Sequence, residues 1–375
     1  MKTKLAVLFG IPFLLGALCA QAQVTLTPLT TFGSDGWLAP NGQDGSTYTY
    51  LTTGSTERGL AFGNGHLYLV SRNGGNYIRI LDPTTGNDLG SLNTSGISGG
   101  TYAVNMIGVG GDGVIYAGNL TVQSTTSPYK VYSWANESSA PTVAYSGNGG
   151  LAGSRVGDTL AVIGSGSSTV LAAGYNSTPS VAGNNGYAII NPTASTATAV
   201  GFTGTPPNAG DFRLGLTFTD SSHVIGTAGS SLYRYSSFSG GTGTLLASPA
   251  IPDPAGATAD RLLSYNVVDG RALLAVQSIG DSHVSLYDVT DPTDPVYLAS
   301  GNNTTGTLTA NVNATGELAW GAPTFNADGS VTEDLYCMSS NQGIQAFIVT
   351  VPEPGAFSLM ALGLGGLAFW RKLRK

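Results

Sequence analysis

The sequence predicts an all-β fold, a β-propeller of six four-stranded blades, and three observations lead to this prediction. Over residues 57–350, short runs of β-branched and aromatic residues alternate with turns rich in Gly, Asn and Asp, which is typical of strands joined by tight turns. The runs form six groups, mostly of four, with a period of about 49 residues, within the range of propeller blades. The last group lacks an outer strand, whereas a β-rich segment at 24–32 has no partner of its own.

These two incomplete ends complement each other. A single four-stranded blade cannot cover both of its faces, so the repeats must stack radially, and closing the ring removes the exposed edges. We therefore expect the N-terminal segment to close the ring as the outer strand of the sixth blade. Residues 307–313 offer a further strand, which leaves a seven-bladed ring open. A pair of β-sandwiches or a β-helix is the alternative architecture.

The individual strands follow from the same alternation of apolar runs and turns. The third repeat lies within 153–203 and has looser turns, and in the sixth repeat Cys337–Ile348 matches the pattern of Val70–Ile80 and supplies two inner strands. The strands expected in the first, second, fourth and fifth repeats are, in order, 58–62, 66–71, 77–81, 89–93; 106–109, 114–120, 129–134, 142–145; 214–218, 223–227, 232–235, 244–247; and 262–268, 272–277, 284–289, 296–299.

Composition excludes several classes of protein. Hydrophobic residues make up 41% of the chain, enough for a large core, so global disorder is not expected. Charged residues make up only 10%, too few for a coiled coil. Between residues 23 and 350, nine basic residues face 21 acidic ones, and no basic patch stands out. An acidic chain of this kind is not expected to bind nucleic acid.

The N-terminus predicts export. Lys2 and Lys4 precede an apolar run of about 14 residues, and Ala20 and Ala22 form a small-x-small cleavage site, which is the pattern of a secretory signal peptide over 1–22. The run is shorter than the ~20 residues that span a membrane, which argues against a transmembrane helix. We expect passage through the Sec translocon and a mature chain that begins at Gln23.

The C-terminus carries three features in a fixed order. Pro352, Glu353 and Pro354 are followed by an uncharged apolar run at 355–370 and then by a basic tail at 371–375. As a helix the run would extend for about 24 Å, slightly less than the hydrocarbon core of a bilayer. The positive-inside rule would keep the basic tail in the cytoplasm and place the bulk of the protein outside.

This tripartite tail, residues 351–375, resembles the PEP-CTERM sorting signal of Gram-negative bacteria that make extracellular polysaccharide. The resemblance implies that an exosortase, a membrane cysteine transpeptidase, recognises the motif at Pro352, Glu353 and Pro354 and removes the tail. It also implies a transient anchor in the inner membrane through 355–370. Three parts are therefore expected: a signal peptide (1–22), a propeller (23–350) and a sorting signal (351–375).

One blade also shows a family likeness. Residues 284–295, Val-Ser-Leu-Tyr-Asp-Val-Thr-Asp-Pro-Thr-Asp-Pro, resemble the LVIVD-type repeat and the YncE-like bacterial surface propellers. The likeness covers about a dozen residues and supports the fold rather than an activity.

No metal or cofactor is predicted. Cys337 is the mature chain's only cysteine, and its strand-like setting predicts a buried small hydrophobe. The histidines do not pair at metal-ligand spacing, and aspartates in one turn are expected to bond their own backbone rather than Ca²⁺. The residues in question are His66, His223, His283, Asp288, Asp291 and Asp294.

Two sets of side chains are candidates for ligand contact. Trp37 and Trp134 could hold a sugar ring, Trp37 as an exposed platform beside Gly36 and Asp35, whereas Trp320 is expected in the core. Arg58, Arg213 and Arg261 each lie near the start of a repeat's first strand and could line one face, with a repeated structural role as the alternative. No catalytic residue is assigned.

Two functions therefore compete. The first is an exported surface or matrix protein without catalytic activity, which reaches the cell envelope through exosortase and binds exopolysaccharide or surface proteins. The second is a secreted propeller enzyme, a polysaccharide lyase or hydrolase, which would need convergent carboxylates or a His, Arg and Tyr cluster on the inner strands.

Overall fold

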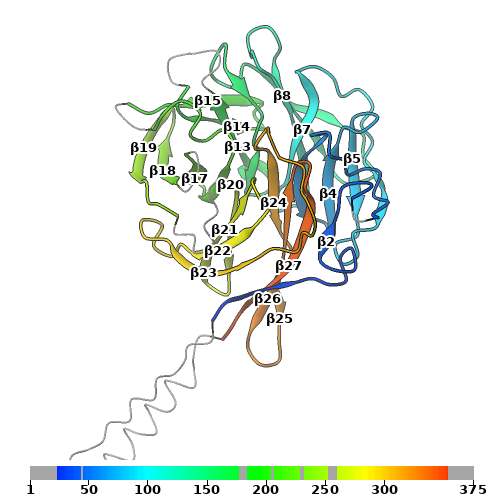
Figure 1. Ribbon diagram of the computed structural model, residues 1–375. Helices are drawn as coiled ribbons and strands as arrows, with labels where there is room; N and C mark the ends of the chain where they lie inside the picture. The colour runs from blue at the N-terminus through cyan, green and yellow to red at the C-terminus, as the bar shows by residue number, and fades with distance from the viewer. Residues whose placement is uncertain are drawn as a thin grey trace, which may run out of the picture.

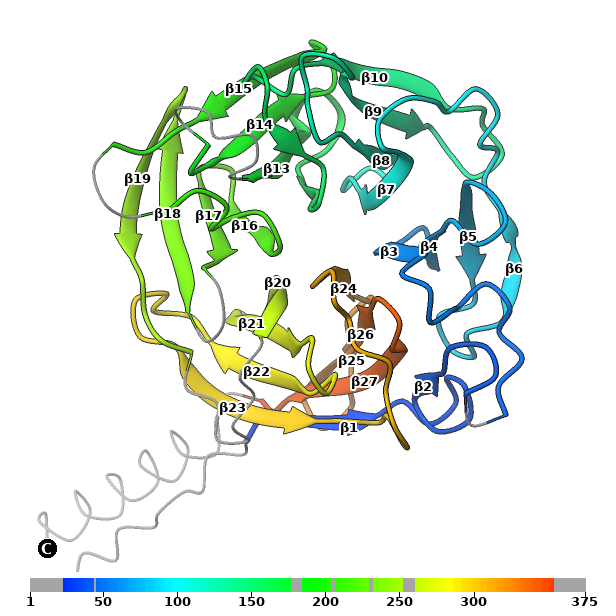
Figure 2. The same cartoon turned by 45° about the horizontal axis from the view of Figure 1, so that its top comes forward.

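Six antiparallel sheets surround a central axis in the computed structural model, so the chain is a six-bladed β-propeller (Figure 1, Figure 2). The structure describes residues 23–43, 45–176, 184–203, 207–228, 232–251 and 260–353. The predicted signal peptide, the segment 355–370 and the basic tail lie outside the described residues. No helix in the described ranges is long and apolar enough to cross a membrane.

The first five blades follow one another along the chain, each as a meander from the channel outwards. Their strands are β3 (Glu57–Gly63), β4 (His66–Ser71), β5 (Tyr77–Leu81), β6 (Asp88–Ser91); β7 (Tyr102–Val109), β8 (Ile115–Leu120), β9 (Tyr129–Trp134), β10 (Thr142–Gly147); β12 (Ala161–Ile163), β13 (Val170–Asn176), β14 (Tyr187–Asn191), β15 (Thr196–Val200), with β11 (Arg155–Val156) also on β13; β16 (Leu216–Asp220), β17 (His223–Thr227), β18 (Tyr233–Ser239), β19 (Thr242–Ala247); and β20 (Asp260–Val268), β21 (Arg271–Ser278), β22 (Val284–Asp288), β23 (Val296–Gly301).

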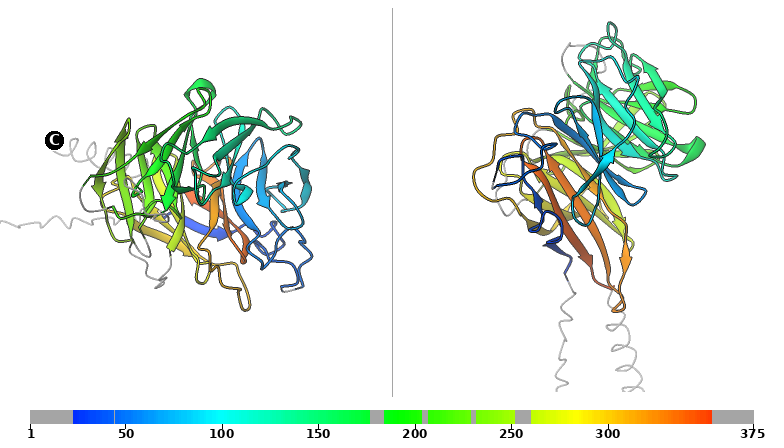
Figure 3. Two further views of the ribbon diagram at one scale, coloured as in Figure 1. Left: turned by 90° about the horizontal axis from the view of Figure 1, so that it is seen from above. Right: turned by 90° about the vertical axis from the view of Figure 1, so that its right-hand side faces the viewer.

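The sixth blade joins the two ends of the chain, which confirms the predicted closure. Its strands from the channel outwards are β24 (Gly316–Trp320), β26 (Val331–Ser339), β27 (Gly343–Val351) and β1 (Thr25–Pro28), with β2 (Trp37–Leu38) on β27 and β25 (Thr324–Phe325) on β26. β1 pairs with β27 in the register Thr25 to Thr350 and Leu26 to Val349, and the two strands lie side by side in Figure 3.

Two details of this blade differ from the prediction. The strands at 331–339 and 343–351 are the second and third strands, because β24 is the innermost one. Residues 307–313 form no strand, so the ring has six blades. In this loop Asn311 donates from Nδ2 to the carbonyl oxygen of Thr315 at 2.7 Å and to Ser339 Oγ at 3.0 Å. These side-chain hydrogen bonds, rather than strand pairing, anchor the loop.

The core lies between neighbouring blades, and the period-two alternation of the inner strands explains why. Leu67 and Leu69 of β4 pack toward the sixth blade, whereas Tyr68 and Val70 pack toward the second. A fully buried aliphatic or aromatic side chain contributes about 1.5–3 kcal/mol. Both faces of each inner strand are therefore buried. Cys337 belongs to the core of the sixth blade, where burial raises the pKa of its thiol well above the usual value.

The connections divide the ring into two faces. We call the face at which all innermost strands begin the upper face. Because neighbouring strands in each blade are antiparallel, the loops between blades and the loops between second and third strands lie on this face. The lower face carries the turns between first and second strands. The third strand β27 ends on the lower face, and β1 begins on it.

The closing strand gives a stability test. Val24 is 1% exposed in the core between the fifth and sixth blades, so Val24→Ala should lower the free energy of unfolding by about 2 kcal/mol. Val312→Ala is the matched control, because Val312 is 82% exposed, and we expect it to change stability by less than about 0.5 kcal/mol. Urea midpoints measure both, and equal midpoints would contradict a stabilising role for the closing segment.

Candidate functional site

The arginines predicted near the starts of inner strands do lie on the upper face, but each has a different environment. Arg58 is the second residue of β3, Arg261 the second of β20, and Arg213 precedes β16 in the loop between two blades. Sequence spacing therefore located the face correctly. It missed the two residues that complete the site around Arg58, which are Arg72 in the loop after β4 and Tyr102 at the start of β7.

Arg58 and Arg72 share one aromatic ring. The guanidinium carbon of Arg72 lies 3.5 Å from the centroid of the Tyr102 ring, and that of Arg58 lies 5.8 Å from it. Arg72 donates from Nη2 to the carbonyl oxygen of Ser55 at 2.8 Å, and Arg58 donates from Nη1 to Thr315 Oγ1 at 2.6 Å. These bonds hold both cations in place. The Nη1 of Arg72 is buried without a hydrogen-bond acceptor among the described residues.

Neither cation forms an ion pair with a carboxylate in the part of the chain that the structure describes. Burial, reinforced by the neighbouring Arg72 charge, lowers the pKa of Arg58 to about 10, and burial also lowers the pKa of Arg72. The nearby Glu57 is occupied elsewhere, since it accepts bonds from the amide of Thr52 and from Thr56 Oγ1. The pair therefore carries positive charge that the protein leaves largely unbalanced.

A cavity of about 860 Å³ opens beside these residues on the upper face. We call it the Arg72 pocket. The Tyr102 ring is 37% exposed there, and much of the remaining lining is loop backbone. The lining residues are Gly54, Ser55, Thr56, Arg58, Arg72, Gly75, Asn76, Gly99, Gly100, Thr101, Tyr102, Ala103 and Asn313.

Arg213, in contrast, is neutralised. Its Nε lies 2.8 Å from Asp158 Oδ2, and Arg155 contacts both oxygens of the same carboxylate at 2.7 and 2.8 Å. Although burial alone would raise the pKa of Asp158, the two guanidinium partners hold it below its usual value. Arg261 is half-buried, and no carboxylate of the described residues forms an ion pair with it. These two arginines therefore do not join the Arg72 pocket.

The tryptophan prediction is wrong for both candidates. Trp37 is 2% exposed and donates its indole N–H to the carbonyl oxygen of Gln342 at 2.9 Å, while Trp134 is fully buried and donates to Asn93 at 2.8 Å. Neither ring has a free face for a sugar. Trp320, expected in the core, packs half-buried against the core of the fifth and sixth blades and also lines the central channel, where its indole N–H donates to the carbonyl oxygen of Ser264 at 3.4 Å.

The other singled-out residues have local partners. His66 contacts Glu137 at 2.7 Å, and His223 contacts Asp220 at 2.8 Å, from equivalent positions on second strands. Asp291 accepts from the amide and hydroxyl of Thr293, as predicted for a turn aspartate. Across the described residues, no group of three or more His, Cys, Asp or Glu side chains could hold a metal ion.

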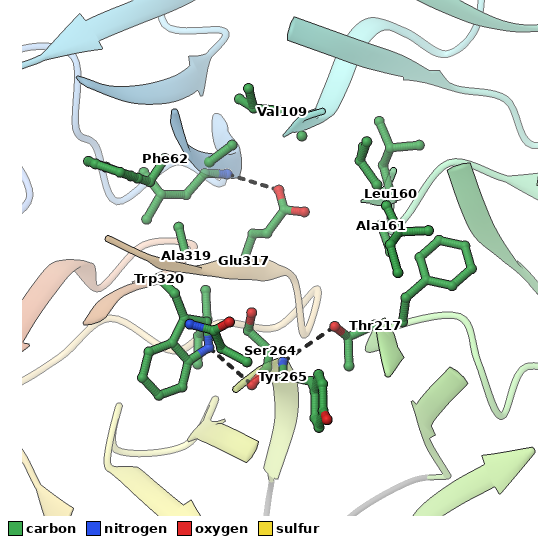
Figure 4. Close-up of a pocket in the computed structure, with 18 of the residues that line it drawn as sticks. Phe62, Val109, Leu160, Ala161, Thr217, Ser264, Tyr265, Glu317, Ala319 and Trp320 are labelled. Carbon is green, nitrogen blue, oxygen red and sulfur yellow. Dashed lines mark hydrogen bonds between the residues drawn. The ribbon is translucent and has the colours of Figure 1, made fainter. Parts of the chain in front are cut away.

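The central channel is the second hollow of the molecule (Figure 4). It has a volume of about 450 Å³, and all six innermost strands line it, mostly with apolar side chains. Glu317 of β24 reaches into it and accepts the Leu60 amide at 3.0 Å, together with the Ile107 amide. This carboxyl thereby ties the sixth blade to the first and second. Burial raises its pKa well above the usual value.

A second buried carboxyl lies on the same blade. Glu333 of β26 is 3% exposed, and its Oε1 accepts a bond from Asn266 Nδ2 at 2.6 Å. Burial, and then the charge of the neighbouring Asp334, raises the pKa of Glu333 to about 7. Glu333 does not line the channel, whose titratable lining residues in the described chain are Glu317 and Tyr265.

The sorting motif begins where the fold ends. Val351 is still the last residue of β27 and is buried, one residue beyond the predicted boundary of the propeller at 350. Pro352 is half-buried and Glu353 is exposed. Pro354, like Ala20 and Ala22 of the predicted cleavage site, lies outside the described residues.

Comparisons with known proteins agree with this architecture. A family described as a domain of unknown function (DUF4623) matches residues 38–291, and the PEP-CTERM protein-sorting motif matches residues 350–375. The crystal structure of a DUF4623 family protein from Bacteroides eggerthii is similar, with a TM-score of 0.57 at 15% identity over 80% of this chain and 72% of that chain. The major allergen Mala s 1 of Malassezia sympodialis has a TM-score of 0.50 at 11% identity over 81% and 95%. No curated relative matches the chain.

At these identities the two crystal structures support the fold alone. The sorting motif also indicates how the protein is processed. It implies exosortase processing, with export and membrane-anchored sorting to the cell envelope.

Glu333 gives a pH test. Its pKa in the folded protein, about 7, exceeds the unfolded value near 4.3, so the folded state binds more protons between these values and stability should fall as pH rises through this window. Glu333→Gln keeps an acceptor for Asn266 and should flatten the fall. Urea midpoints at about pH 4.5, 6 and 8 measure this. Parallel curves for the two proteins would show that Glu333 does not cause the dependence.

Proposed function

Because the chain belongs to the DUF4623 family and ends in a PEP-CTERM sorting motif, we propose that it is a non-catalytic surface protein whose propeller binds acidic exopolysaccharide. The Arg72 pocket is the binding site in this proposal. The protein is delivered to the envelope by exosortase, and its upper face then holds a segment of the polymer through carboxylate or other anionic substituents.

The unbalanced Arg58 and Arg72 pair is the observation that carries the proposal. Arg58 is buried and Arg72 is half-buried, and two such cations side by side repel each other and are costly unless an anion joins them. Nine basic residues face 21 acidic ones between residues 23 and 350, so an exposed arginine would readily have found a carboxylate partner. Five described arginines have done so, namely Arg79, Arg155, Arg213, Arg234 and Arg271. The charge left in the pocket favours an anionic ligand.

The rest of the pocket suits a sugar acid. Arginine presents a planar fork that matches a carboxylate, and the Arg72 guanidinium lines the pocket without an ion pair to a carboxylate among the described residues. The exposed part of the Tyr102 ring provides an apolar surface for a pyranose. A volume of about 860 Å³ accommodates a short oligosaccharide.

The absence of catalysis in this proposal rests on the arrangement of titratable groups. Glycoside hydrolysis usually needs two carboxyl groups across the scissile bond. The described lining of the Arg72 pocket contains no carboxyl group, and that of the channel contains only Glu317. A secreted polysaccharide lyase or hydrolase remains the competing function, and shortening of the polymer would identify it.

Binding is tested with an acidic polymer such as polygalacturonate. Arg72→Gln should weaken the affinity at least about ten-fold, because it removes the charge and the fork that face the pocket. Isothermal titration measures the affinity, and chromatography of the polymer after incubation measures its length. Binding with unchanged length agrees with the proposal, and shortened polymer contradicts it.

Arg79→Gln is the matched control. Arg79 also stacks on a tyrosine, at 4.5 Å from the Tyr77 ring centroid, but it is paired with Asp88 at 3.3 Å and lies outside the pocket. We expect this variant to bind like the unchanged protein. Equal losses in both variants would indicate non-specific attraction to positive charge rather than a site.

Sorting is tested by ending the chain after Val351. This truncation keeps β27 whole, since Val351 pairs with Val331, and removes the motif together with the tail. We expect the propeller to fold but to appear free in the culture medium or periplasm, as measured by fractionation and immunoblotting. Normal retention in the envelope would contradict exosortase-dependent sorting.

A further inference from the structure

The sixth blade has an unusual connection between its first and second strands. In the first and fifth blades this turn has two residues, Asn64–Gly65 and Asp269–Gly270. In the sixth blade residues 321–330 separate β24 from β26, and the connection forms an added hairpin with β25. We call residues 321–331 the lower hairpin. It extends from the lower face beside the end of β27 (Figure 1).

The lower hairpin has a defined turn. The amide of Asn326 donates to the carbonyl oxygen of Ser330 at 2.9 Å, and the amide of Gly329 donates back to Asn326 at 3.0 Å. Asp328 Oδ1 accepts from both the amide and the hydroxyl of Ser330, at 3.0 and 2.7 Å. The tip is therefore fixed by its own hydrogen bonds rather than by contacts with the ring.

The sorting motif runs along this hairpin. Val331 pairs with Val351, so continuing the antiparallel register places Gly329 beside Glu353. The contact is close, because a Cβ atom at Gly329 would lie 2.7 Å from Glu353 Oε2. Gly329 also has φ +84°, which other residues rarely adopt. Glycine at this turn thus allows the motif glutamate to rest against the hairpin backbone.

Gln23, the first described residue, lies on the other side of the motif. Thr25 pairs with Thr350, so the same register places Gln23 beside Pro352. Gln23 is fixed in turn, since its Nε2 donates to the carbonyl oxygen of Leu298 at 2.7 Å. Pro352 has no N–H, which ends the ladder there. The first residues of the motif are therefore held in one position relative to the folded sixth blade.

The outer strand of the hairpin presents an apolar side chain. Phe325 is 77% exposed, opposite Val331 in the ladder. The apolar run 355–370 begins two residues after Glu353, at most about 7 Å along an extended chain. Phe325 therefore lies close to the point at which the chain would meet the membrane and the membrane-embedded sorting enzyme.

We propose that the lower hairpin is a docking surface for exosortase, with Phe325 as its apolar anchor and the Gly329 contact with Glu353 as the feature that sets the motif's position. This inference rests on the sorting part of the proposed function. The motif that the enzyme recognises lies directly against a folded domain. The enzyme must therefore contact the protein surface beside the motif. Aromatic side chains are frequent anchors in such interfaces.

The experiment compares tail removal in cells that express the full-length chain and exosortase. Phe325→Ser should slow removal at least about five-fold, as expected for an interface anchor. Val312→Ser is the matched control, because Val312 is equally exposed but lies in the loop that leads to β24 on the upper face. Pulse-labelling followed by gel mobility gives the rates. Equal rates for the two variants would overturn the proposal.

A second variant tests the position of the motif. Inserting Gly-Ser-Gly-Ser between Val351 and Pro352 leaves β27 intact but moves Glu353 away from Gly329, and it should also slow removal. Faster removal would show instead that the hairpin shields the motif, and would overturn docking. Because neither variant touches the core, both should keep the urea midpoint of the unchanged protein.

Cross-linking separates the enzyme from the lipid as the contact of Phe325. Phe325→p-benzoylphenylalanine in the full chain should give a covalent adduct with exosortase on irradiation. An adduct with lipid alone would overturn the proposal in favour of a membrane contact. If the unchanged chain kept its tail, the sorting function itself would fail, which is distinct from unchanged rates in the hairpin variants.

Discussion

The pairing of β1 with β27 is the contact on which the rest of the structure depends. The first five blades are each formed by consecutive strands of the chain, but the sixth needs a strand from the other end of the chain. Val24 and the half-buried Leu26 bring apolar side chains from that strand into the core between the fifth and sixth blades. Because each blade covers the face of its neighbour, an open sixth blade would expose the core on two sides.

The same closure gives the two faces different roles. It brings Gln23 and the sorting motif to one edge of the lower face, beside the added hairpin. The upper face is then free of both ends, and its loops carry the Arg72 pocket. In the proposed function the protein is therefore processed at one face and binds its ligand at the opposite face, so the two activities do not compete for surface.

Much of the fold was accessible from the sequence because its causes are local. The strands at 66–71, 77–81, 129–134 and 223–227 match the prediction residue for residue, since alternating apolar positions and Gly or Asn turns determine them. The innermost strand β24 was missed as the start of the sixth blade. It pairs with β26 across the added hairpin, and its Glu317 binds the amides of two other blades, contacts that no local pattern reveals.

The sequence by itself determined the repeats and the sorting motif, because local patterns of residues encode them, and it determined the closure because the incomplete sixth repeat and the unpaired segment at 24–32 complement each other. Only the tertiary structure decided which side chains form the site. Trp37 is buried and donates to the carbonyl oxygen of Gln342, 305 residues away, and Arg72 contacts the Tyr102 ring of a neighbouring blade. Whether a tryptophan is exposed or an arginine is neutralised depends on which blades and loops pack around it, and that is set by the geometry of the closed ring.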